Sequence, residues 1–180
     1  MGKIFNRKID LIESIKENEG YRSRPYVCPT GHWTIGYGFK ILSLSEGEAE
    51  ALFGMIAKNV IEMAKANDKD ALGEIVISKE TARAILNARL NDIWDKIEAS
   101  KPRGYFNDLS NNLKYHLIEW AYQLGVGGIF KFKKAWAAID DRDWDEAICE
   151  VMNSLWARQT PKRMNDLRSA FEFERDVMNG

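Results

Sequence analysis

The sequence predicts an α+β fold that is mostly helical, with one small antiparallel sheet near the N-terminus. Residues 21–38 mix aromatic residues, Thr, Pro and Gly in a way typical of short strands and turns. From residue 45 onward, apolar residues recur at helical spacing. The 180 residues fit one compact domain or two small lobes that share a core, and 45% of them are hydrophobic, enough to bury that core.

Two helices are expected to flank the strand region. Ile9, Ile12 and Ile15 predict an amphipathic helix over residues 7–19. Gly20 would end that helix, because Gly accepts the left-handed conformation common at helix C-termini. After the strands, Ser45 followed three residues later by a Glu is a capping-box pattern, and one apolar stripe predicts a helix from there to residue 67.

The next predicted helix lies near residues 79–98. At about twenty residues it would span roughly 30 Å, which suits it to join two lobes. From Asp108 the pattern stays helical, with a break at the glycines of residues 125–128. Further helices are expected near 129–139, from Trp144, and from Pro161 toward Val177, with Thr160 as N-cap of the last.

Composition excludes several classes of function. A formal net charge of −1 gives no electrostatic case for nucleic-acid binding. No apolar run is long enough for a membrane span or a secretory signal, so we expect a protein made in a cytoplasm, without membrane insertion. Two Cys and two His do not form a metal-type spacing or a disulfide scaffold, so we expect no metal and no cofactor.

Glu19 is the first candidate for chemistry. A carboxylate in the last turn of the expected helix would meet the negative end of the helix dipole, which raises its pKa. A raised pKa is what a carboxylic general acid needs near neutral pH. The alternative is a solvated Glu beside a helix-ending Gly, and a lone Glu-Gly pair does not decide between them.

Cys28 and Thr34 are the next candidates, nine and fifteen residues after Glu19. A hairpin that folds back on the helix end would bring all three around one cleft. Cys28 could be a nucleophile, a general base or a small core residue, and an ordinary thiol, with a pKa near ~8.5, stays mostly protonated at neutral pH. Thr34 alone is also simply a good strand residue.

These residues stand in a pattern that resembles phage lysozymes of glycoside hydrolase family 24, the T-even and lambdoid endolysin type. The family pattern is Glu, eight residues, Asp or Cys, five residues, Thr, and Glu19, Cys28 and Thr34 match it. The surrounding residues agree as well: Glu19-Gly20-Tyr21-Arg22, Pro25-Tyr26, Gly31 and Thr34-Ile35-Gly36-Tyr37-Gly38. Far downstream, three segments are similar to the helical lobe of the T-even lysozymes: residues 122–125, 144–147 and 156–163.

The resemblance implies a lysozyme-like two-lobed fold that forms a single catalytic domain. Residues 20–77 would be the N-terminal lobe with the small sheet, residues 78–99 the connecting helix, and residues 100–180, with the N-terminal helix 1–19, the helical lobe. It also implies hydrolysis of the β-1,4 bond between N-acetylmuramic acid and N-acetylglucosamine in bacterial peptidoglycan, with inversion. The enzyme would be a monomeric endolysin that waits in the host cytoplasm and lyses the host cell after release.

The resemblance also assigns roles to residues. Glu19 would protonate the leaving glycosidic oxygen, while Cys28 and Thr34 would position or activate water. Gln123 and Trp156 match positions that line the cleft, although packing between the lobes is an equal alternative. Arg163 would reach Glu19, where its charge would favour the carboxylate and oppose the dipole effect.

Cys28 stands where many members carry Asp, so two other functions are open. One is a cysteine-type wall amidase or peptidase that pairs Cys28 with His32 or His116. The other is a peptidoglycan-binding protein whose catalysis is impaired.

Overall fold

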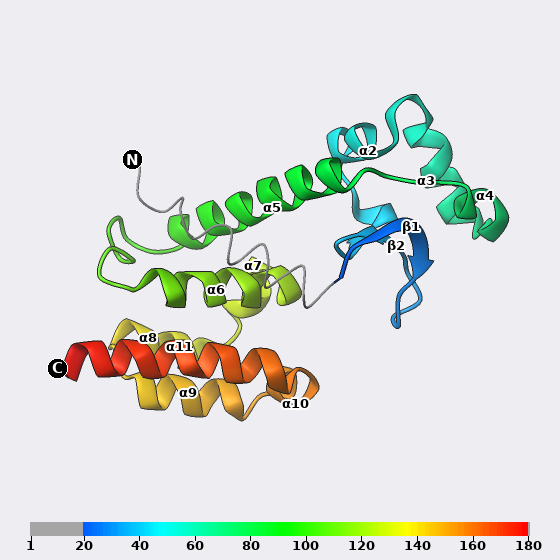
Figure 1. Cartoon of the computed structure of the whole chain (residues 1–180). Helices are drawn as coiled ribbons and strands as arrows, with labels where there is room; N and C mark the ends of the chain where they lie inside the picture. The colour runs from blue at the N-terminus through cyan, green and yellow to red at the C-terminus, as the bar shows by residue number, and fades with distance from the viewer. Residues whose placement is uncertain (1–19, 180) are drawn as a thin grey trace. The chain divides into compact units, whose positions relative to one another are not determined.

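The computed structural model describes residues 20–179, which divide into two compact units, residues 20–89 and residues 90–179. Figure 1 shows the sheet and the short helices of the first unit and the helices of the second. The boundary falls inside helix α5 (Lys79–Ala99), which matches the long helix that the sequence predicts. The helix expected over residues 7–19 lies outside the described residues. Gly20 has a φ of 66°, the left-handed conformation expected of it.

The predicted sheet is confirmed as three antiparallel strands in the order β1-β2-β3. Its strands are β1 (Arg22–Val27), β2 (Trp33–Gly36) and β3 (Phe39–Lys40). Ile35, Tyr37 and Phe39 are fully buried and form the core of this unit together with the following 3₁₀ turn η2 (Ile41–Ser43). Gly36 ends β2 with a φ of 65°, and a Cβ there would lie 3.0 Å from the Phe39 ring, so a glycine is required.

The single helix predicted from Ser45 to residue 67 is wrong in one respect, because the chain forms two helices there. They are α2 (Glu46–Phe53) and α3 (Ala57–Ala66), separated by the 3₁₀ turn η3 (Gly54–Ile56). Gly54 takes a φ of 60°, which ends α2 although the apolar stripe continues. The predicted capping box at Ser45 is present. A short helix, α4 (Lys69–Gly73), follows that the sequence pattern did not indicate.

Glu48 joins the cap of α2 to the long helix α5. Its carboxylate accepts the Ser45 backbone N–H at 2.9 Å, and it accepts from Arg89 Nε at 2.6 Å and from Arg89 Nη2 at 3.0 Å. The hydrogen bond from Arg89 is the main cause that lowers the pKa of Glu48 to about 2, against the effect of burial. The Arg89 guanidinium also lies 4.7 Å from the centroid of the Phe39 ring. The Arg89 side chain of α5 therefore contacts both the cap of α2, through Glu48, and the sheet, through Phe39.

We expect Glu48→Gln to lower the free energy of unfolding by about 1–2 kcal/mol at pH 7, a value reduced because both partners keep contact with water. The folded pKa lies below the unfolded one, so this stability is present above pH ~4.3 and is lost as the pH falls toward 2. Urea denaturation of both proteins across that range measures it. Glu50→Gln, an exposed position in the same helix, is the control. A difference that does not depend on pH would contradict the assignment.

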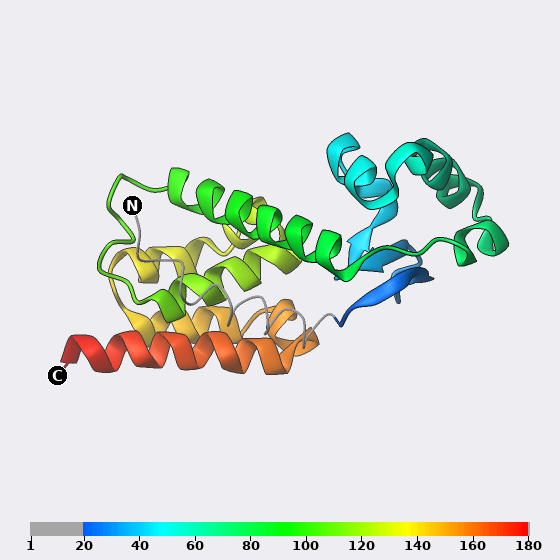
Figure 2. The same cartoon turned by 45° about the horizontal axis from the view of Figure 1, so that its top comes forward.

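The second unit is helical. After α5, its helices follow the predicted order, and two further short helices are present. They are α6 (Asn111–Leu124), α7 (Val126–Ile129), α8 (Lys133–Asp140), α9 (Trp144–Met152), α10 (Leu155–Gln159) and α11 (Pro161–Asn179). The short helices α7 and α10 were not expected, and α8 begins four residues later than predicted. Helix α11 packs along α6 and α9, as Figures 1 and 2 show.

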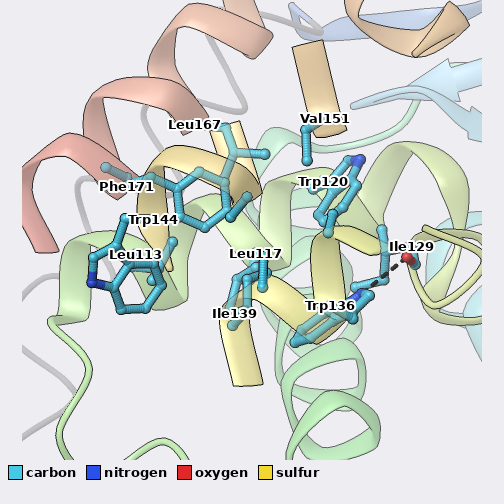
Figure 3. Close-up of a cluster of buried hydrophobic side chains, with 14 of the residues drawn as sticks. Leu113, Leu117, Trp120, Ile129, Trp136, Ile139, Trp144, Val151, Leu167 and Phe171 are labelled. Atoms are coloured by element: carbon cyan, nitrogen blue, oxygen red, sulfur yellow. Dashed lines mark hydrogen bonds between the residues drawn. The ribbon is translucent and has the colours of Figure 1, made fainter. Parts of the chain in front are cut away.

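The core of this unit gathers apolar side chains from α6, α8, α9 and α11 (Figure 3). Trp136 lies in it with its indole N–H donating to the backbone oxygen of Ile129 at 2.9 Å, the dashed line in that view. Trp120 is buried to 1% exposure, and its indole N–H has no partner among the described residues. The two tryptophans therefore fill similar volumes but differ in one hydrogen bond.

We expect Trp136→Phe to destabilise the protein more than Trp120→Phe, by about 1–2 kcal/mol. The first change removes a buried hydrogen bond, whereas the second removes a polar group that has no partner in the described structure. Denaturation by guanidinium chloride measures both variants against the same wild type. Equal losses, or a larger loss for Trp120→Phe, would contradict this account.

None of the helices within residues 20–179 combines the length and the apolar character needed to cross a membrane.

Candidate active site

A short turn between β1 and β2 places Cys28 close to Thr34. Cys28 directly follows β1, and its backbone N–H donates to the carbonyl oxygen of His32 at 2.9 Å. The N–H of Gly31 returns to the carbonyl of Cys28 at 2.8 Å, and Gly31 has a φ of 79°, which a side chain would disfavour. The strand register then pairs Tyr26 with Thr34. The turn thus fixes where the thiol stands relative to the second strand.

The carbonyl oxygen of His32 connects the two candidates. It accepts the Cys28 N–H at 2.9 Å and also the hydroxyl of Thr34, whose Oγ1 lies 2.9 Å away. Thr34 is 2% exposed, so its hydroxyl is held in place by burial as well as by this bond. The structure therefore brings Cys28 and Thr34 together, as the spacing in the sequence suggested.

The thiol of Cys28 is electronically unusual. Its Sγ lies 3.1 Å from the hydroxyl oxygen of Thr30, and this hydrogen bond is the main cause that lowers the pKa of Cys28 to about 6. Burial opposes the shift, while the Thr34 hydroxyl and the backbone of His32 and Thr30 add to it. The lowered pKa favours the thiolate form of Cys28 near neutral pH. The sequence analysis used the pKa of an ordinary thiol, and these hydrogen bonds lower the pKa of Cys28 below that value.

Thr30 is a site residue that the sequence analysis missed. It lies two positions after Cys28, inside the turn. In turns, a Ser or Thr hydroxyl often forms a hydrogen bond with a group one to three residues away. This tendency of Ser and Thr was the sequence signal that could have identified Thr30. No imidazole is among the groups that lower the pKa of Cys28.

Gln123 and Trp156 form a second pair, in the helical unit. The Trp156 indole N–H donates to Gln123 Oε1 at 2.9 Å, and Trp156 is 6% exposed. The ring lies 5.8 Å from that of Trp120, centroid to centroid. Gln123 Nε2 is buried without a partner among the described residues. The pair thus has a structural role in this unit, and its contact with substrate stays a prediction.

Arg163 lies in the first turn of α11 and is partly buried. The hydroxyl and the N–H of Thr160 both donate to the carbonyl of Trp156, at 2.8 and 2.9 Å, which closes α10 just before α11 starts. Glu19 itself lies outside the described residues, so its expected contact with Arg163 stays a prediction. Cys28 and Thr34 belong to residues 20–89, whereas Gln123, Trp156 and Arg163 belong to residues 90–179.

Across the described part of the chain, no three His, Cys, Asp or Glu side chains gather in a way that could hold a metal ion. His116 lies 3.2 Å from Glu119, on the helix that also carries Gln123. At the hairpin, the Cys28 thiol lies with the hydroxyls of Thr30 and Thr34, and backbone groups hold them.

Comparison with known proteins identifies the family. The model of the phage lysozyme family matches residues 16–170 of this chain. The chain belongs to the phage lysozyme family. The match covers the hairpin with Cys28 and Thr34 as well as Gln123, Trp156 and Arg163, so both candidate groups lie inside the matched range. The family resemblance inferred from the sequence is thereby confirmed.

Individual members of the family agree. The chain is 30% identical over 163 residues to "Probable T4-type lysozyme 2" of Dictyostelium discoideum, covering 90% of this chain and 93% of that protein. It is 28% identical over 167 residues to "Probable T4-type lysozyme 1" of the same organism, covering 90% and 95%. It is also 26% identical over 159 residues to the "Pre-baseplate central spike protein Gp5" of Enterobacteria phage T4, where 27% of that longer protein is matched. The chain is thus a lysozyme-type hydrolase with a peptidoglycan substrate.

Proposed function

We propose that this protein is an N-acetylmuramidase that cleaves the β-1,4 bond between N-acetylmuramic acid and N-acetylglucosamine. The observation that carries the proposal is the hairpin, where Cys28 and Thr34 share the carbonyl of His32. These are two of the three positions of the family pattern, and Glu19 supplies the third. The lowered pKa of Cys28 favours a negative charge near neutral pH at the position where many members have Asp.

In this proposal the reaction is a single displacement at the anomeric carbon of muramic acid. Glu19 donates its proton to the glycosidic oxygen as the bond to N-acetylglucosamine breaks. A water molecule attacks from the opposite face of the sugar, oriented by the Cys28 thiolate and the Thr34 hydroxyl. The thiolate accepts a proton from that water, which becomes the new hydroxyl of muramic acid, with inversion of configuration. Arg163 would favour the ionised form of Glu19 after proton transfer.

The proposal extends to the biological role. The enzyme would act as a monomer on the cell wall after release from the host cytoplasm, and so lyse the host cell. This part is supported by the family alone, and size-exclusion chromatography of the purified protein would test the monomer.

Product analysis on purified peptidoglycan tests the reaction. We expect the wild-type protein to generate new reducing sugar ends and no new free amines. New amines without reducing ends would transfer the chemistry to the peptide and to Cys28 as a nucleophile. Retained binding to peptidoglycan without either product would leave a wall-binding protein. Each of these two outcomes would contradict the proposed reaction.

A further inference from the structure

A hollow of about 520 Å³ opens beside the catalytic hairpin, within the unit of residues 20–89. It is lined by residues 31–33 at the end of the hairpin turn, by Lys40 and residues 42–43, and by Ala64 and Asn67 at the end of α3. We refer to it as the Trp33 hollow. Neither Cys28 nor Thr34 lines it, so the proposed bond cleavage does not account for it.

The indole of Trp33 forms a fixed wall of this hollow. Its Nε1 donates to Asn67 Oδ1 at 2.8 Å, so the polar edge of the ring is engaged. Asn67 is itself held in the left-handed conformation, with a φ of 56°, because its N–H closes the C-terminus of α3. An aromatic ring held in this way offers an apolar face at little cost in conformational entropy. Such faces suit the C–H side of a pyranose ring or the methyl of an acetamido group.

Lys40 supplies a positive charge at the same place. Its exposed ammonium has no carboxylate partner within the described part of the chain, and no Asp or Glu lines the hollow. Lys40 is the cross-strand partner of Thr34, so the two side chains leave the same face of the sheet about 5 Å apart at Cβ. The Lys40 side chain therefore leaves the sheet beside Thr34.

We propose that the Trp33 hollow is an accessory subsite for a carboxylate-bearing muramyl unit of the substrate. The sugar or its acetamido group would pack on Trp33, and a carboxylate would pair with Lys40. This inference rests on the proposed substrate and adds a residue that selects charged, peptide-bearing glycan over neutral glycan. In a peptide-bearing unit the lactyl carboxyl forms the amide bond to the stem peptide, so the carboxylate that pairs with Lys40 belongs to the stem peptide. In a unit without peptide it is the lactyl carboxylate itself.

Binding of soluble fragments to the Glu19→Gln protein tests the subsite without hydrolysis. Three fragments are compared by calorimetry: a disaccharide with its stem peptide, the same fragment with its peptide carboxylates amidated, and a neutral N-acetylglucosamine oligomer. We expect Lys40→Gln to weaken the charged fragment about fivefold, less at high salt, and to leave the neutral oligomer unchanged. Lys58→Gln removes the same charge from an exposed position of α3 outside the hollow, and should change nothing.

One further fragment and one further variant locate the contact. A peptide-free muramyl fragment, whose lactyl carboxylate is free, serves as a fourth ligand. Dependence on Lys40 there would show that the subsite also accepts the lactyl carboxylate, and dependence in the peptide-bearing fragment alone would restrict the ion pair to the stem peptide. Trp33→Leu should weaken all three fragments, with thermal melting as the check that it folds. An equal loss for charged and neutral fragments in Lys40→Gln, or no loss, would overturn the subsite. Because binding is measured without turnover, its failure is distinct from a failure to form reducing ends.

Discussion

Glu19→Gln is expected to reduce the lytic rate by about 10²–10⁴-fold, the range that removal of a general acid produces. A glutamine keeps the size of the side chain but has no acidic proton to give to a leaving oxygen. The measurement is the initial rate at which the turbidity of a suspension of cell walls falls, normalised to folded protein by circular dichroism.

Glu50→Gln is the matched control, because it makes the same chemical change at an exposed position of α2. Its rate should stay close to that of the wild type. If Glu19→Gln cleared cell walls at the wild-type rate, Glu19 would not be the acid, and the family pattern would not describe this enzyme.

Alkylation of Cys28 is the second large effect. In the Cys149→Ser background, where Cys28 is the single thiol of the chain, the rate of modification by iodoacetamide should rise with pH and level off above a midpoint near 6. The pKa is lowered, so the reactive thiolate is present above the midpoint and disappears as the pH falls through it. Lytic activity should be lost in step with modification, because the added group occupies the place of the attacking water.

Thr30→Val tests the cause of that midpoint. The hydroxyl of Thr30 contributes most to the lowered pKa of Cys28, so its loss should move the midpoint to higher pH. If the Cys149→Ser protein, with Thr30 intact, showed a midpoint near the ordinary thiol value of ~8.5, the geometry of the turn would be contradicted. Activity retained after full alkylation would exclude Cys28 from the reaction.

Residue patterns predicted the local elements well where one signal dominated. The strands around Gly36 and the capping box at Ser45 followed from glycine and hydroxyl chemistry that acts over a few residues. The split at Gly54 was missed, because the apolar stripe runs across it unbroken and hides one glycine with a positive φ. The short helices α7 and α10 depend on caps and packing. With four and five residues, they are too short to show a periodic pattern of apolar residues in the sequence.

The candidate site was predictable in part for a similar reason. The spacing of Cys28 and Thr34 was sufficient to place them on one hairpin, where both donate to the carbonyl oxygen of His32. The charge state of Cys28 was not predictable, because it depends on a hydroxyl distance inside a turn. The Trp33 hollow was not predictable either, since it needs Asn67 from the end of α3, more than thirty residues away in the chain.

The identity of the sugar at the new reducing end tests the central claim most directly. Peptidoglycan digested by the wild-type protein is reduced with borohydride, and the fragments are identified by mass spectrometry. We predict muramitol ends throughout the wild-type digest and their absence with Glu19→Gln. Reduced glucosamine ends, or fragments released by cleavage of the peptide, would contradict a muramidase.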